Sequence, residues 1–125
     1  MGTLFYSDLA DEAQRYARSR DRNTPAGVLR LIADHLQRVG VSRSGDGYDV
    51  VPGKRYEDSP ACVIHAEGVL GLRGAPPPVL AADQAIEDYL DRTGDTRSLV
   101  DWSDTADPAE VIGTLYRLAD ELDAA

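Results

Sequence analysis

The stretch TPAGVLRLIADHLQRVG, residues 24–40, contains the signals that begin, fill and end a helix. Thr24 is a favoured N-cap residue, and Pro25 suits the first helical position. Apolar residues recur at the helical period, namely Val28, Leu31, Ile32, Leu36 and Val39. Gly40 stands where a C-terminal cap belongs. The stretch therefore predicts a helix and a mainly α-helical domain built around it.

Two further helices are predicted on either side of this stretch. Residues 4–19 place Leu9, Ala13 and Tyr16 at helical spacing, with acidic residues early and arginines late, as the helix dipole prefers. After the stretch, Ser59-Pro60 repeats the cap-plus-proline signal. It predicts a short helix from Ala61 to Leu72.

The C-terminal third predicts two more helices separated by a loop. An apolar stripe after Pro78 stops at Gly94. Asp107 and Glu110 then form a capping box for a last helix that reaches Leu122. We expect residues 95–107 to form the loop between them.

Residues 41–59 lack helical periodicity, and Ser44-Gly45-Asp46-Gly47 separates two short extended stretches. A small hairpin or an ordered loop fits this pattern. We therefore expect residues 1–125 to form one compact bundle of about five helices, with an irregular or hairpin insert near residues 41–59.

The net charge of the 125-residue chain is −9, and all of it lies in residues 79–125, which hold twelve acidic groups against three arginines. Such a charge keeps a small protein soluble, and it also suits an acidic face for a basic partner. The arginines near Arg18 are interleaved with acidic residues, which argues against nucleic acid as the partner.

Cys62 is the single cysteine, so no disulfide can form within the chain, and a reducing compartment fits best. The N-terminus has no cationic region followed by an apolar stretch, and no window is long and apolar enough for a membrane span. We expect a cytoplasmic protein without a membrane segment.

Cys62 and His65 are the candidate catalytic residues, because side chains three apart in a helix can be neighbours. A thiolate–imidazolium pair is conceivable there, while a small core cysteine is the plainer interpretation. His35 and His65 show no metal-ligand spacing, and the glycines of residues 68–74 lack the strand of a dinucleotide loop. We predict neither a metal nor a cofactor.

Trp102 is the only tryptophan, and Asp101 and Asp104 flank it. A lone tryptophan between helices is typical of a core plug, whereas an aromatic residue rimmed by carboxylates is typical of a binding anchor. We expect Trp102 to be buried, with Asp104 bonded to backbone amides near the start of the last helix. Trp102, Asp101 and Asp104 are also the candidate binding residues.

Three features carry a resemblance to a known family: the helix ending at Gly40, the short helix starting near Cys62, and Trp102-Ser103-Asp104 before Glu110-Val111. Over residues 24–122 the chain resembles a family of small uncharacterised domains of actinobacteria and their phages. The resemblance implies a helical fold and that source, and it brings no established activity.

The first functional hypothesis is a non-catalytic protein–protein interaction or regulatory module of a bacterial or phage cytoplasm. Two alternatives stay open, a small cysteine-dependent enzyme using Cys62 and His65, and an acidic inhibitor whose carboxylates imitate DNA phosphates. The expected partner is another protein, and the sequence leaves open whether the chain forms a homo-oligomer.

Overall fold

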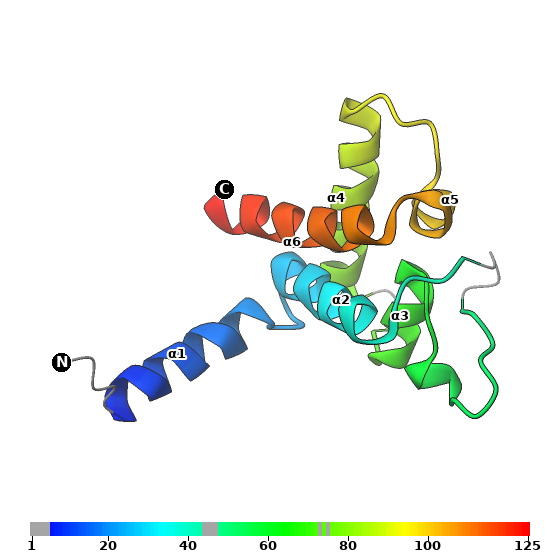
Figure 1. The fold of residues 1–125 in the computed structure, drawn as a ribbon. Helices are drawn as coiled ribbons and strands as arrows, with labels where there is room; N and C mark the ends of the chain where they lie inside the picture. Colours follow the sequence, from blue (N-terminus) through cyan, green and yellow to red (C-terminus); the bar gives the residue numbers. More distant parts are fainter. Residues whose placement is uncertain (1–5, 44–47, 73, 75) are drawn as a thin grey trace.

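The computed structural model describes residues 6–43, 48–72, 74 and 76–125, and within them the chain is mainly helical, as predicted (Figure 1). The described residues form six α-helices and one 3-10 turn, rather than about five helices. They are α1 (Tyr6–Ser19), α2 (Pro25–Val39), η1 (Tyr56–Asp58), α3 (Val63–Val69), α4 (Pro77–Arg92), α5 (Leu99–Thr105) and α6 (Pro108–Ala124).

Helix α2 is the centre of the fold, and it packs most extensively against α6 and also against α4 and α3. The predicted caps are present, because the Thr24 side chain accepts a hydrogen bond from the amide of Gly27 at 3.0 Å and Gly40 has a φ of 94°. Buried apolar side chains of α2 line the core, namely Val28, Leu29, Ile32, Ala33 and Leu36. Burial of this stripe stabilises the fold, since each large side chain of this kind contributes about 1.5–3 kcal/mol.

Gly27 allows the first turn of α2 to approach the preceding turn of the chain. A Cβ atom placed on Gly27 would lie 1.8 Å from the carbonyl oxygen of Asp21. Only glycine fits at this distance, because the contact is with backbone that cannot rotate away. The close approach fixes where the chain leaves α1 and enters α2.

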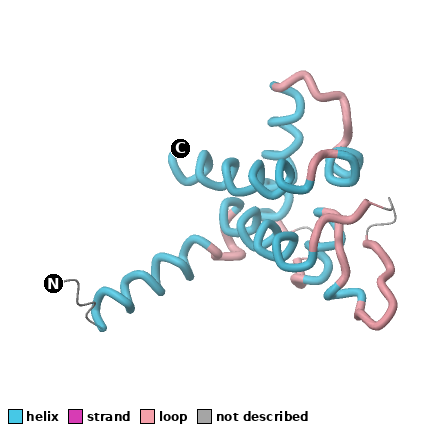
Figure 2. Tube along the Cα trace, in the orientation of Figure 1, coloured by secondary structure: helices cyan, strands magenta, loops and turns pink. Residues whose placement is uncertain are grey.

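The segment after α2 does not pair as a simple hairpin. Val41 and Tyr48 each form an isolated bridge with Ala61, the first parallel and the second antiparallel. The amide of Ser42 donates to the carbonyl of Ala61 at 2.9 Å, and the amide of Asp49 donates to the carbonyl of Pro60 at 2.9 Å. Residues 59–61 therefore lie between the two stretches, while the predicted turn at residues 44–47 lies outside the described residues. Figure 2 shows most of the described part of this connection as loop, apart from the short turn η1.

The prediction of a helix from Ala61 to Leu72 was too long at both ends. The backbone groups of Ala61 are bonded in the bridges, and its amide donates to the carbonyl of Gly40 at 3.0 Å. The helix therefore begins at Val63, and the thiol of Cys62 accepts a hydrogen bond from the amide of His65 at the cap. It ends at Val69, before Gly71 takes up a φ of 73°.

The expected loop at residues 95–107 contains helix α5, and that expectation was wrong. Ser98 is its N-cap and accepts a hydrogen bond from the amide of Asp101 at 3.1 Å. Buried residues follow at helical spacing, namely Leu99, Trp102, Ser103 and Ala106. Seven residues make a helix too short to be stable alone, so this packing maintains it.

Helix α6 begins as predicted, because the Asp107 carboxylate accepts hydrogen bonds from the amides of Ala109 at 2.9 Å and Glu110 at 3.4 Å. The amides at the start of α6 are thus bonded to Asp107, as the capping signal predicts. Among the described residues no helix is long and apolar enough to cross a membrane.

Helix α1 projects away from the other five helices (Figure 1). Its C-terminal end is attached to α2 and α6, because Arg20 and the Tyr116 hydroxyl both donate to the Asp34 carboxylate, at 3.1 Å and 2.5 Å. Arg30 adds a hydrogen bond to the carbonyl of Ser19 at 3.2 Å. Residues 8–18 of the helix are all exposed.

Candidate binding pocket

The contact between Cys62 and His65 is a hydrogen bond between the Cys62 side chain and the His65 backbone. The Cys62 thiol accepts a hydrogen bond from the His65 amide at 3.4 Å. Burial raises the pKa of the Cys62 thiol, and the charge of Asp104 raises it further. A thiol held neutral is a poor nucleophile, so this geometry does not favour the cysteine-dependent reaction.

The imidazole of His65 instead belongs to an aromatic cluster. It stacks on the ring of Tyr48 with centroids 4.6 Å apart, and it meets the ring of Tyr56 edge-on at 5.8 Å. His65 Nε2 lies 3.4 Å from the carbonyl oxygen of Tyr56. The histidine therefore fastens the loop before α3 to that helix.

Trp102 is 1% exposed and lies in the core, as expected for a core plug. Its neighbour Ser103 is also buried, and the Ser103 hydroxyl accepts a hydrogen bond from the amide of Val63 at 3.1 Å. Asp104 offers its backbone carbonyl to Arg43 at 2.9 Å. The Trp-Ser-Asp segment of α5, residues 102–104, is thus hydrogen-bonded to the start of α3, next to Cys62. We call this contact the Trp-Ser-Asp junction.

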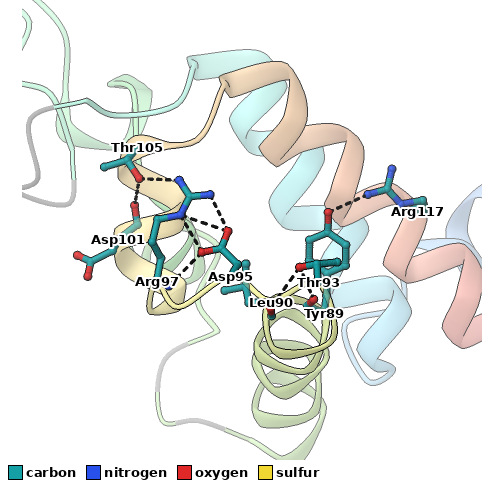
Figure 3. Close-up of polar contacts among 8 residues, drawn as sticks. All are labelled: Tyr89, Leu90, Thr93, Asp95, Arg97, Asp101, Thr105 and Arg117. Carbon is teal, nitrogen blue, oxygen red and sulfur yellow. Dashed lines mark hydrogen bonds and ion pairs between the residues drawn. The ribbon is translucent and has the colours of Figure 1, made fainter.

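The loop of residues 93–98 is built around one arginine (Figure 3). The guanidinium of Arg97 binds the Asp95 carboxylate, with Nη2 2.7 Å from Oδ2, and donates to the Thr105 hydroxyl at 2.9 Å. Thr105 in turn donates to the carbonyl of Asp101 at 2.6 Å. The adjacent guanidinium holds the pKa of Asp95 at about 2. This network fixes the loop against α5.

The end of α4 sets the direction of this loop. The Thr93 hydroxyl donates to the carbonyl of Tyr89 at 2.8 Å, and Gly94 takes a φ of 77°. A positive φ lets the chain reverse at the helix end, as the glycine there predicts. The amide of Asp95 then donates to the carbonyl of Leu90 at 2.8 Å.

Two open pockets flank the loop, and Thr96 and Arg97 belong to the walls of both. The larger measures about 530 Å³ and the smaller about 280 Å³. The larger is lined by Tyr89, Thr93, Gly94, Asp95, Thr96, Arg97, Trp102 and Glu110. An edge of the otherwise buried Trp102 therefore forms part of a surface pocket, while Asp101 is exposed on the adjoining helix.

Both pockets contain carboxylates that form no salt bridge with the described residues. Glu110 lies in the larger pocket, and Glu87 and Asp91 line the smaller one. The positive charge of Arg97 is already engaged by Asp95. In each pocket the acidic wall residues consequently outnumber the basic ones, and the larger pocket also has aromatic wall residues.

Tyr89 forms the aromatic wall opposite Arg97. The guanidinium carbons of Arg92 and Arg117 each lie 5.7 Å from the centre of its ring, within the range of a cation–π contact. The Tyr89 hydroxyl lies 3.4 Å from Arg117 Nη2 (Figure 3). Of the walls of the larger pocket, the sequence singled out Trp102 as a candidate binding residue, because the other walls come from α4, α6 and the loop that joins α4 to α5.

A second unusual feature is a buried carboxyl pair between α3 and α4. Glu67 is 6% exposed, and its carboxyl group lies next to that of the half-buried Asp83. Burial, together with the charge of Asp83, raises the pKa of Glu67 to about 9. One proton is therefore shared within the pair at neutral pH.

No three His, Cys, Asp or Glu side chains in the described part of the chain are grouped closely enough to hold a metal ion. His35 lies on α2 and is buried, and burial lowers its pKa. The two histidines are close enough for the charge of His65 to contribute to that shift.

The fold and the pocket define a small helical domain that displays an open, acidic pocket beside a buried tryptophan junction. The chain belongs to a family of unknown function, DUF6197, whose model matches residues 20–121. The match agrees with the resemblance to an uncharacterised small domain over residues 24–122. No curated protein and no solved structure matches the chain. The matched residues include the junction and the pocket, whereas α1 lies before them.

Proposed function

We propose that this chain is a non-catalytic protein-interaction module, which binds a basic segment of a partner protein at the pockets beside residues 93–98. The observation that carries the proposal is the set of carboxylates in the pocket walls, Glu110, Glu87 and Asp91, which have no salt-bridge partner among the described residues. An arginine or lysine side chain would supply the missing opposite charge.

The aromatic wall of the larger pocket suits the same ligand. The stems of arginine and lysine pack on apolar surface while their charged ends stay near polar groups. A volume of about 530 Å³ is sufficient for one long side chain and its flanking backbone.

The charge distribution supports the same class of partner. Residues 79–125, which contain both pockets, carry the whole net charge of −9. A field of one sign speeds the encounter with an oppositely charged partner. The unpaired, buried thiol of Cys62 suits a reducing compartment, and we place the module in a bacterial or phage cytoplasm.

Fluorescence titration can test the proposal, because Trp102 is the only tryptophan and forms part of the pocket wall. The probe is the amidated pentapeptide Gly-Arg-Gly-Arg-Gly, and the matched peptide with glutamates in place of arginines is the control. We expect the arginine peptide to change the Trp102 emission saturably at low salt, and to bind severalfold more weakly near ~0.3 M salt.

Two variants with the same charge change locate the site. Glu110→Gln removes a pocket carboxylate and should weaken binding about two- to fivefold, as expected for a partly exposed ion pair. Glu12→Gln makes that change on α1, away from the pocket, and should leave affinity unaltered. Equal binding of both peptides, or equal loss in both variants, would overturn the assignment of the pocket to a basic segment.

A further inference from the structure

Helix α2 buries a histidine whose ring nitrogens have few hydrogen-bond partners. His35 is 5% exposed, and its Nε2 atom is buried without a hydrogen-bond partner among the described residues. Its Nδ1 atom lies 3.4 Å from Nη2 of Arg38, on the next turn of the helix. A buried polar nitrogen without a partner is rare in a folded protein and costs free energy.

The arginine determines which protonation state of His35 fits the fold. A guanidinium group only donates hydrogen bonds, so Nδ1 of His35 can bind Arg38 only while it carries no proton. The ring is then neutral, with its hydrogen on Nε2. A second proton would make Nδ1 a donor that faces the donors of Arg38. The buried cation would have no acceptor for either N–H group in the described arrangement.

The charged groups around His35 come from three elements, with Arg38 on α2, Asp58 in η1 and His65 on α3. Burial lowers the pKa of His35, and the charges of Arg38 and His65 lower it further. The charge of Asp58 raises that pKa, but its carboxylate is bound to Arg38, with 3.2 Å between Oδ1 and Nη1. Among the described residues, α1, α4 and α6, which also pack on α2, add no charged group to this set.

The other histidine of the chain tolerates a second proton. Nε2 of His65 lies 3.4 Å from the carbonyl oxygen of Tyr56, which only accepts hydrogen bonds. This nitrogen therefore keeps its hydrogen in the neutral ring and in the charged ring. The face of Tyr48, 4.6 Å away between centroids, attracts a cationic ring. Acid consequently preserves the contacts of His65 and disrupts the contact of His35 with Arg38.

We propose that His35 is a pH switch, which keeps the η1 segment (residues 56–58) on α2 while its ring is neutral and releases that segment when the ring gains a proton. Water can reach the buried imidazolium only if the neighbouring chain moves. The Arg38–Asp58 ion pair joins η1 to α2, and repulsion between the charged ring and Arg38 weakens this link. No residue of η1 is buried, so the segment can move without exposing the core.

The direction of the pH effect follows from the two states. In the released state the ring is hydrated and has an ordinary pKa of about 6.5, whereas burial lowers the pKa of His35 in the closed state. The closed state therefore binds fewer protons, so it is fully favoured above about pH 6.5 and is progressively lost below it. The Glu67–Asp83 pair holds its proton more fully in acid, so it does not contribute to this opening.

Hydrogen exchange of the full chain, followed by NMR between about pH 7.5 and pH 5.5, tests the switch. The reporters are the amides of Asp58 and Ser59, which are hydrogen-bonded within the turn at 3.0 Å and 3.3 Å. At about pH 5.5 a hydrated imidazole is roughly ten to one protonated, so opening should increase about five- to tenfold after correction for intrinsic exchange. The imidazole signals of the two histidines are followed in the same samples, and the midpoint of His35 should lie below about pH 6.5.

Two variants and a control locate the effect. His35→Asn keeps an acceptor for Arg38 and cannot titrate, so its opening should change less than about twofold over this pH range. Arg38→Gln alters an exposed side chain and leaves the core intact. Its amide can donate to the neutral ring and accept from the charged ring, so the increase should fall below about threefold. Arg55→Gln removes the exposed ion pair with Glu57 beside the same turn and should keep the wild-type increase.

The proposal goes beyond the basic-segment site, because neither His35 nor the η1 segment lines the pockets beside residues 93–98. Amides of the η1 segment whose opening does not increase in acid would overturn the switch. An increase that persists unchanged in Arg38→Gln or in His35→Asn would do the same, as would a His35 midpoint at or above that of a hydrated imidazole.

Discussion

The carboxyl pair of Glu67 and Asp83 makes the stability of this protein depend on pH in a predictable direction. The pKa of Glu67 rises from an ordinary value of 4.5 to about 9 on folding. Between these values the folded chain binds more protons than the unfolded chain, so its stability falls as pH rises. The contribution of the shared proton is complete below about pH 4.5 and is lost above about pH 9.

The substitution Glu67→Gln removes this dependence. The amide group of glutamine can donate to the Asp83 carboxylate without a titrating proton. Because a tenfold change in a protonation equilibrium corresponds to about 1.4 kcal/mol, the wild type loses up to about 3 kcal/mol between about pH 4.5 and pH 7. The variant should therefore match the wild type near pH 4.5 and exceed its stability by about 2–3 kcal/mol at pH 7.

Urea unfolding and thermal melting, both followed by circular dichroism from about pH 4.5 to pH 8.5, measure the difference. For a chain of this length, we expect the variant to melt about 8–12 °C higher at pH 7. Glu87→Gln, an exposed change on α4, is the matched control and should follow the wild-type curve. Parallel pH curves for wild type and Glu67→Gln, or a variant less stable at pH 7, would show that the pair does not hold a shared proton.

Three further outcomes follow from burial and close contact. Trp102→Ala should lower the free energy of unfolding by about 3–5 kcal/mol in urea titrations. The fluorescence of Trp102 in the native wild type should be blue-shifted, and an emission like that of solvent-exposed indole would contradict its position in the core. Iodoacetamide at pH 7 should label Cys62 slowly in the folded chain and quickly in urea, because burial raises the pKa of the thiol. Fast labelling of the folded chain would instead support Cys62 as a nucleophile. Gly27→Ala should destabilise the fold strongly, because its Cβ would lie 1.8 Å from the Asp21 carbonyl oxygen. A Cβ on Gly113 would meet nothing within 4 Å, so Gly113→Ala should stabilise the fold by about 1 kcal/mol. Thermal melting followed by circular dichroism measures both.

The long helices could be predicted because their signals are local. Thr24 and Asp107 begin α2 and α6 through side-chain bonds to amides two or three residues away. Gly40 and Gly94 follow the ends of α2 and α4 with positive φ. Caps and apolar stripes depend only on residues within a few turns, so a single sequence contains them.

The short elements depend on contacts that the sequence pattern does not contain. Helix α3 begins at Val63 because Ala61 forms bridges with Val41 and Tyr48. In addition, the Ser103 hydroxyl, forty residues away in the chain, accepts a hydrogen bond from the Val63 amide. Ser98 caps helix α5 through the amide of Asp101, and the prediction of a loop over residues 95–107 did not include this cap. Its seven residues are maintained by the burial of Leu99 and Trp102.

The candidate site was only partly predictable for the same reason. Trp102 could be singled out because an isolated aromatic residue among carboxylates stands out in a sequence, and it lines the larger pocket, whereas Asp101 lines neither. Their role in binding stays a prediction. Glu110 was predicted only as a capping residue, and it is the packing of α6 beside α4 that sets it in a pocket with Tyr89. The coupling of Glu67 to Asp83 likewise arises only when α3 and α4 meet.

The pocket and helix α1 differ in their relation to the family. The Trp-Ser-Asp junction and the pockets lie inside residues 20–121, so the part of the chain that the family model matches also builds the acidic walls around residues 93–98. Helix α1 ends at Ser19, immediately before the matched region. Its attachment through Arg20 and Asp34 uses the first matched residue and a helix of the core. Variants of α1 such as Glu12→Gln should therefore leave the pocket unaltered.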